Sequence, residues 1–173
     1  GDSLESIKKK GIKARSKGNK NYYELKNLSK PSRKFRRYSA WILPENGLCI
    51  IEATTRFIDT SSYGDELKDN FYTIENSLIK KYGKNKKIDR LRPNSIWDEP
   101  NEWMASLRKK ERYFSSRWQK ENGSNLPEEI KAIDLKAKAE NFPWSEGEIE
   151  IRYWLSNYDR CKEEITGINT DNL

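Results

Sequence analysis

The 173-residue sequence contains no histidine, and only two of its residues are cysteines. The absence of histidine excludes Ser-His and Cys-His nucleophile pairs, His-ligated zinc and any imidazole-based pH switch. Two cysteines are also too few for a four-thiolate zinc site. From the side chains that remain we predict no catalytic residue, no metal site and no cofactor.

Long apolar runs are missing as well, and a typical run, Leu48–Ile51, is only a few residues long. A membrane-spanning helix needs about 20 apolar residues, so no transmembrane segment is predicted. The sequence begins at Gly1 without a methionine, and its only methionine is Met104. We therefore expect a processed or truncated product, from which a signal peptide could have been removed.

Positive charge is concentrated at the N-terminus. Residues 1–40 hold 13 Lys and Arg against 3 acids, whereas residues 41–173 carry a net charge of −3 within the overall +7. Basic residues interleaved with aromatic ones are typical of single-strand nucleic-acid binding, and they also suit an anionic membrane surface. The residues predicted to contact nucleic acid, if that is the partner, are Lys8, Lys9, Lys10, Arg33, Arg36 and Arg37.

The composition predicts three regions. Residues 1–21 are dense in charge and poor in apolar side chains, which favours a basic flexible arm. Residues 22–157 contain enough large aromatic side chains to bury a core and are predicted to form a single α+β domain. Residues 158–173 are predicted to be a polar C-terminal tail, beginning with a short helix around Cys161.

Hydrophobic periodicity predicts the main elements of that domain. Residues 34–58 alternate around a turn at Asn46-Gly47, which indicates a β-hairpin, and residues 133–140 and 148–155 alternate as a second one. Apolar side chains three or four residues apart, from Leu67 to Tyr82, predict a helix with a Ser62–Asp65 capping box and Gly83 at its end. With a strand at 112–119 and a short helix after Pro100, the prediction is an α+β fold: an antiparallel sheet of about five strands with one long and one short helix packed on one face.

Two carboxylate-containing segments are weighed as metal or acid–base sites. Asp98, Glu99 and Glu102 surround Pro100, and acids in a first helical turn are favoured by the helix dipole alone, so the capping interpretation is preferred. The loop from Asp59 has glycine at the sixth position of a calcium loop but Asn70 at the twelfth, where a bidentate glutamate is needed. Neither segment is therefore predicted to bind a metal.

The segment from Trp97 to Met104 is the predicted ligand or partner surface, because exposed Trp and Met recur at recognition sites. The alternative is that both of its tryptophans belong to the core. The residues assigned to this surface are Trp97, Asp98, Glu99, Trp103 and Met104.

A histidine-independent hydrolase is a third hypothesis. A glutamate base with arginine or lysine stabilising a phosphate would suffice for such an enzyme. Glu111, Arg112 and Tyr113, or Glu150, Arg152 and Trp154, could supply these groups, but charges alternate on the wet face of any antiparallel sheet. A purely structural role is therefore favoured for both sets.

Cys49 and Cys161 are either bridged or two buried free thiols. The even count permits one disulfide in an exported protein, because disulfides persist in oxidising compartments, whereas free thiols would argue against export.

Three motifs resemble a family of small uncharacterised bacterial proteins. They are Tyr63–Leu67, the helix end Lys81-Tyr82-Gly83-Lys84 and the segment Ser95-Ile96-Trp97-Asp98-Glu99-Pro100. The similarity covers residues 35–157 and brings no assigned activity, but its members are often exported. We therefore expect a non-enzymatic, periplasmic or secreted domain that binds an unknown protein or small ligand. A nucleic-acid-binding protein that uses residues 1–40, and a cytoplasmic location, are the alternatives.

Overall fold

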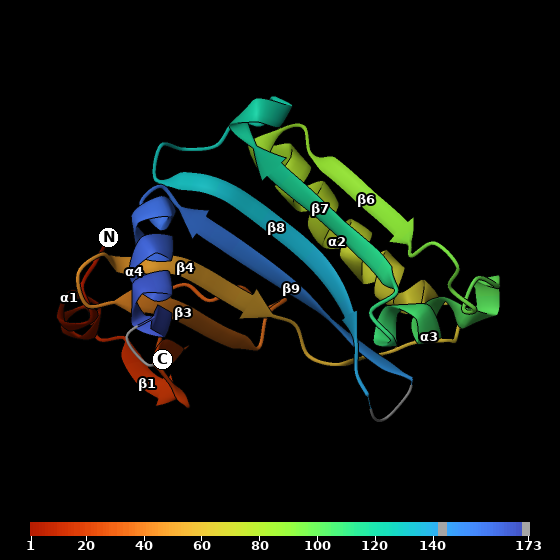
Figure 1. Ribbon diagram of the computed structural model, residues 1–173, viewed down its shortest axis with the longest axis horizontal. Coiled ribbons are helices and arrows are strands. Elements are labelled where there is room, and N and C mark those ends of the chain that lie inside the picture. The colour runs from red at the N-terminus through yellow and green to blue at the C-terminus, as the bar shows by residue number, and fades with distance from the viewer. Residues whose placement is uncertain (142–144, 171–173) are drawn as a thin grey trace.

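The protein, described by a computed structural model over residues 1–141 and 145–170, is built on one antiparallel sheet with helices on both of its faces (Figure 1). In chain order the elements are α1 (Leu4–Lys9), β1 (Lys13–Lys17), β2 (Asn19–Lys26), β3 (Arg37–Leu43), β4 (Gly47–Thr54), β5 (Ile58–Asp59), α2 (Asp65–Tyr82), β6 (Lys86–Leu91), α3 (Trp103–Arg108), β7 (Arg112–Gln119), β8 (Ile130–Ala139), β9 (Glu146–Leu155) and α4 (Tyr158–Thr170). The strand order is β1-β2-β3-β4-β9-β8-β7-β6, and β5 pairs with β9. Residues 171–173 of the predicted tail and 142–144 of the second hairpin loop lie outside the described residues.

The predicted fold class is wrong in its strand count, its helix count and the placement of the helices. The described residues form nine strands and four α-helices, not five strands and two helices. Two of the missed strands, β1 and β6, are the edges of the sheet, and nearly all of their residues are exposed. Such edges carry Lys and Arg, which deter pairing with another chain, so they show no apolar alternation that a sequence pattern could detect.

The elements with strong periodicity are confirmed. The first predicted hairpin forms β3 and β4, the second forms β8 and β9, and the strand at 112–119 is β7. Leu67, Phe71 and Ile74 of α2 are buried against the sheet, where the core also contains side chains from β7, β8 and β9. The 3.6-residue period of α2 and the two-residue period of the strands thus build the same core.

The N-terminus of α2 differs from the predicted capping box. The residue before the helix is Gly64, whose φ of 74° is disfavoured for other residues, and no side-chain cap is formed by Ser62. Instead the Glu66 carboxylate accepts hydrogen bonds from the Thr60 hydroxyl and the Ser61 amide, both at 2.9 Å. The ring of Trp103 fills the space beside Gly64, so a Cβ there would lie 2.2 Å from a ring carbon.

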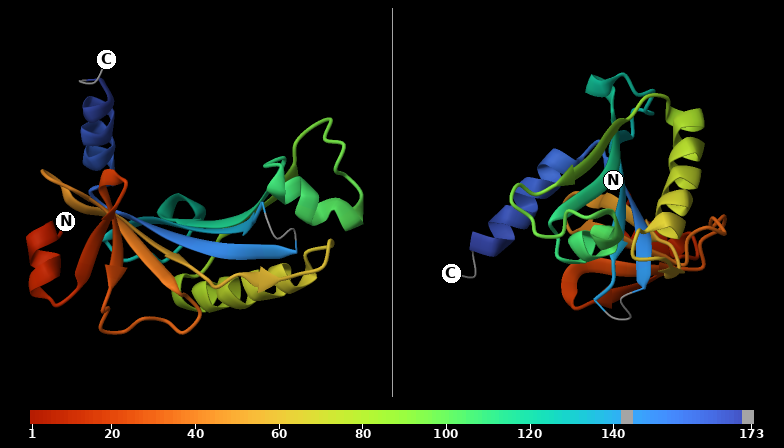
Figure 2. Two further views of the ribbon diagram at one scale, coloured as in Figure 1. Left: turned by 90° about the horizontal axis from the view of Figure 1, so that it is seen from below. Right: turned by 90° about the vertical axis from the view of Figure 1, so that its right-hand side faces the viewer.

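The helices lie on both faces of the sheet (Figure 2). α1, α2 and α3 pack on one face, whereas α4 stands on the other, over the end of β4 and β9. A disulfide joins Cys49 of β4 to Cys161 of α4, with a Cα–Cα distance of 6.2 Å. Among the described residues no helix is long and apolar enough to cross a membrane. Over β7, β8 and the middle of β9, the face that bears α4 is covered by no described helix (Figure 1).

Candidate anion-binding site

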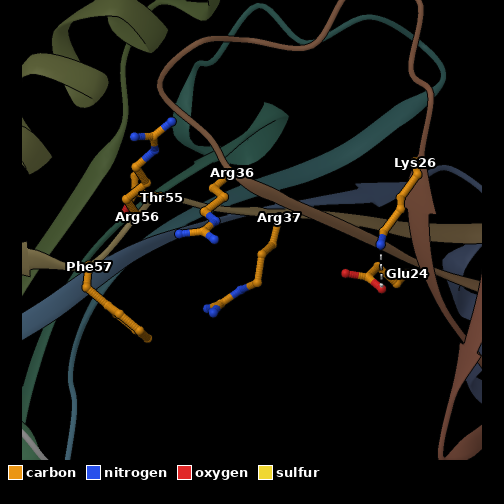
Figure 3. A pocket seen from close by; sticks show the side chains of 7 residues that line it. All are labelled: Glu24, Lys26, Arg36, Arg37, Thr55, Arg56 and Phe57. Carbon is orange, nitrogen blue, oxygen red and sulfur yellow. Dashed lines mark ion pairs between the residues drawn. The ribbon is translucent and has the colours of Figure 1, made fainter.

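A cavity of about 450 Å³ lies where the β2–β3 loop meets the chain leaving β4 (Figure 3). Its lining contains four cations and one acid, and the complete set is Glu24, Lys26, Arg36, Arg37, Thr55, Arg56 and Phe57. Figure 3 shows Arg36 and Arg37 between Phe57 on one side and the Glu24–Lys26 ion pair on the other, with Arg56 pointing away from them. The cavity is therefore strongly cationic.

Backbone hydrogen bonds at the end of β4 bring these side chains together. The Arg36 amide donates to the Thr54 carbonyl at 2.9 Å, which holds the β2–β3 loop against β4. Two hydrogen bonds join Thr55 to Ile149 of β9. The Thr55 amide donates to the Ile149 carbonyl and the Thr55 hydroxyl accepts from the Ile149 amide, each at 3.0 Å. Arg56 follows Thr55 directly, and the folding of the hairpin brings it to the same cavity as Arg36, although its side chain points away from Arg36.

Only some of these cations are neutralised. Arg37 forms an ion pair with the buried carboxylate of Glu148, and its guanidinium lies 5.5 Å from the centre of the Phe57 ring. Burial raises the pKa of the Glu148 carboxyl, although the charge of Arg37 opposes that shift. Within the described residues, no carboxylate lies within ion-pair distance of Arg36 or Arg56.

A second cavity of about 190 Å³ adjoins the first, because Thr55 and Arg56 line both. It adds Arg33 and Lys34, two further side chains with no described carboxylate partner. Six cations therefore face two adjoining hollows that contain one carboxylate, Glu24. Such an arrangement suits an oxyanion, because guanidinium groups bind phosphate or sulfate oxygens through paired hydrogen bonds.

The structure divides the predicted nucleic-acid residues into two groups. Arg33, Arg36 and Arg37 line the adjoining cavities, whereas Lys8, Lys9 and Lys10 belong to or follow α1. The Leu48 amide donates to the Asp2 carbonyl near the start of β4, while the Arg36 amide donates to Thr54 at its end, so about 20 Å of strand separates the two contacts. Lys10 is also neutralised by Asp2, at 2.6 Å.

Several lining residues were not among those predicted, including Lys26, Lys34, Thr55 and Phe57, and the most consequential of them is Arg56. It lies outside the basic N-terminal region, and only its position directly after a predicted strand could have drawn attention to it.

The predicted surface at Trp97–Met104 lies in a different part of the molecule. Trp103 and Met104 are 5% and 2% exposed and belong to the core, whereas Asp98 and Glu99 are exposed and Trp97 is half-buried. Glu99 and Glu102 cap the helical turn reciprocally, and the Glu99 amide donates to the Glu102 carboxylate at 3.3 Å. These acids therefore have the helix-capping role that the sequence favoured.

The groups proposed for a hydrolase are not gathered at the cationic cavity. Glu111 accepts a hydrogen bond from Ser95 at 2.5 Å and Arg112 pairs with Asp89 at 2.6 Å, so both hold loops and an edge strand. Glu150 and Arg152 do lie together, at 3.2 Å, on the uncovered sheet face. The described residues include no group of three or more acidic or sulfur side chains arranged to hold a metal ion.

No protein-family model, no curated protein and no solved structure matches this chain.

Proposed function

We propose that the protein is a non-enzymatic binding domain whose ligand carries phosphate or sulfate groups, and that the cationic cavity holds those groups. The observation that carries this proposal is the pair Arg36 and Arg56, which line one cavity without a described carboxylate partner. Arg36 and Arg37 lie side by side in this cavity, and a bound oxyanion would reduce the repulsion between their charges. Phe57, 49% exposed at the rim, offers an apolar contact to the rest of the ligand.

Export to the periplasm or the medium is part of the proposal. The Cys49–Cys161 bond is compatible with it, because structural disulfides form and persist in oxidising compartments. The resemblance of the helix-end and Ser-Ile-Trp segments to a family of often exported bacterial proteins points the same way. A cytoplasmic protein would keep both thiols reduced.

Calorimetric titration of the full chain with inorganic tripolyphosphate tests the cavity. The variant Arg36→Gln/Arg56→Gln removes two cavity charges, and Lys8→Gln/Lys9→Gln removes two charges from α1 at the other end of β4. Because a charge-assisted hydrogen bond contributes about 1.5–3 kcal/mol, we expect the cavity variant to bind at least tenfold more weakly. The α1 variant should bind within about threefold of the wild type, because only screened long-range attraction is lost.

Equal losses of affinity in the two variants would show that tripolyphosphate binding depends only on net charge, and they would refute the cavity as the binding site. Absence of heat for the wild type up to millimolar tripolyphosphate would also refute it. Circular dichroism and thermal unfolding of each variant establish that the fold is retained.

A further inference from the structure

The cationic cavity continues across the uncovered face of the sheet. A third cavity, of about 280 Å³, shares Glu24 and Arg37 with the first, and a fourth, of about 290 Å³, shares Glu150 with the third. The third is lined by residues from β1 to β4 and from β8 and β9, and the fourth by residues from β6 to β9. The three cavities thus share lining residues in series, and together their linings draw on strands from β1 to β6; we call this series of cavities the sheet groove.

Strand register explains why the groove is polar along its length. Glu52 on β4, Arg152 on β9, Asp134 on β8 and Arg117 on β7 are successive cross-strand partners, so their side chains form one row on this face. Ion pairs join neighbours in that row, with Arg152 Nε 2.7 Å from Glu52 and Arg117 3.0 Å from Asp134. These pairs fix the charges in place without covering the groove.

Cations outnumber acids in this part of the groove as well. Six cations line it, against four acids, and each acid is paired with a lysine or arginine; the cations are Lys17, Arg37, Arg117, Lys136, Lys138 and Arg152. Lys136 is half-buried and has no described carboxylate within ion-pair distance. Burial, together with the charges of Lys138 and Arg152, lowers the pKa of the Lys136 amine, which an approaching anion would reverse.

Aromatic rings are exposed at both ends of this cationic path. Tyr113 is 43% exposed in the fourth cavity, with Arg90 and Lys136 at 5.6 and 5.8 Å from its ring centre. Phe57 is 49% exposed in the first. Trp154, by contrast, is already engaged, since its indole donates to Asp134 at 2.7 Å and its ring packs against Tyr158.

We infer that the sheet groove binds single-stranded nucleic acid, with phosphates along its cations and a base stacked on Tyr113. The inference rests on the proposed function and names the class of its ligand. Three strand spacings of about 4.8 Å separate β4 from β7, so the ligand must be extended and carry repeated charges, as a nucleic-acid strand does. The exposed rings favour it over an acidic polysaccharide, because every base offers a flat face for stacking.

Fluorescence anisotropy with the full chain and a labelled ten-nucleotide dT strand tests the inference. The matched probe is an abasic strand of the same length and charge, and a sulfated polysaccharide serves as the competitor. Tyr113→Ala removes the stacking ring, Lys136→Gln removes one groove cation, and Tyr63→Ala removes a ring of similar exposure (47%) outside the groove.

We expect dT to bind at least fivefold more tightly than the abasic strand, because one stacked base contributes roughly five- to hundredfold in affinity. Tyr113→Ala should abolish that preference and leave the salt dependence unchanged. Lys136→Gln should make the negative slope of log K against log salt shallower by about 0.7, the value for one phosphate contact on a single strand. Tyr63→Ala should behave as the wild type.

Equal affinity for dT and the abasic strand would overturn the inference, and so would tighter binding of the sulfated polysaccharide together with insensitivity to Tyr113→Ala. Neither result contradicts the proposed function as long as the affinity for tripolyphosphate still depends on Arg36 and Arg56. Loss of that dependence would refute the proposed function itself. Thermal unfolding of each variant separates a lost contact from a lost fold.

Discussion

The disulfide between β4 and α4 is expected to contribute a large part of the stability, because it joins residues 112 positions apart. A cross-link over a loop of that length restricts the unfolded chain by ~5 kcal/mol in the chain-entropy model. In the folded state the same regions are held together without it, since Ile50 of β4 pairs directly with Trp154 of β9. Removing the bond should therefore act mainly on the unfolded chain.

The measurement is urea unfolding, followed by circular dichroism, of the oxidised protein, the reduced protein and the variant Cys49→Ala/Cys161→Ala. We expect the reduced protein and the variant to lose about 3–5 kcal/mol of unfolding free energy, which corresponds to a decrease in Tm of roughly 10 °C or more. Their m-values should rise, because an unfolded chain without the cross-link exposes more surface.

A loss below about 1 kcal/mol with an unchanged m-value would contradict this prediction, because it would mean that the disulfide does not constrain the loop in the unfolded state. The reduced wild type is the control for the substitutions: agreement between it and the variant attributes the loss to the bond, not to the two missing sulfur atoms.

Two further predictions concern single side chains. Gly64→Ala should destabilise the protein by roughly 2–4 kcal/mol in chemical unfolding, because the new methyl group would meet the Trp103 ring at 2.2 Å, while Gly123→Ala, with φ of 81° but nothing within 4 Å, should cost only about 1 kcal/mol. Similar losses of unfolding free energy in both variants would mean that the positive φ, and not the contact with Trp103, accounts for the destabilisation. The pKa of the Lys136 amine is lowered below its ordinary value of 10.5 in the folded state. Between the folded-state pKa and 10.5 the folded protein therefore binds fewer protons than the unfolded chain does. As the pH rises through that range, the free energy of unfolding of the wild type increases. Lys136→Met should therefore be more stable than the wild type at pH 7, and its free energy of unfolding should not show this increase in alkaline buffer. Chemical unfolding of both proteins at pH 7 and in alkaline buffer is the measurement. A variant less stable than the wild type at pH 7 would contradict the prediction.

The elements that the sequence predicted correctly are those whose side chains bury one face. α2 and the two hairpins repeat apolar residues at the period of their own geometry, which local sequence displays directly. The edge strands β1 (Lys13–Lys17) and β6 (Lys86–Leu91) were not predicted, for the opposite reason. Each pairs with a neighbouring strand on one side only, and nearly all of its residues are exposed. Their charge is a property of edges and resembles that of a linker.

The candidate site was predicted only in part. Arg33, Arg36 and Arg37 were recognised because they cluster within a few residues, and local clustering is visible in any sequence. Arg56 was not, since it joins them only after the β3–β4 hairpin folds back, and the predicted lysines of α1 are removed to the other end of β4 by the same folding.

The chemistry available to this protein can be read from its amino-acid composition: the chain has no histidine, is rich in Lys and Arg near its N-terminus, and has enough large aromatic side chains to form a core. Where that chemistry lies depends on how the chain folds. Cross-strand register aligned charges from distant segments on one face of the sheet, while the packing of α3 in the core buried Trp103 and Met104 and Tyr113 stayed exposed. The reason is that periodicity acts between neighbours along the chain, whereas a site on an antiparallel sheet is assembled between strands, whose order no local pattern encodes.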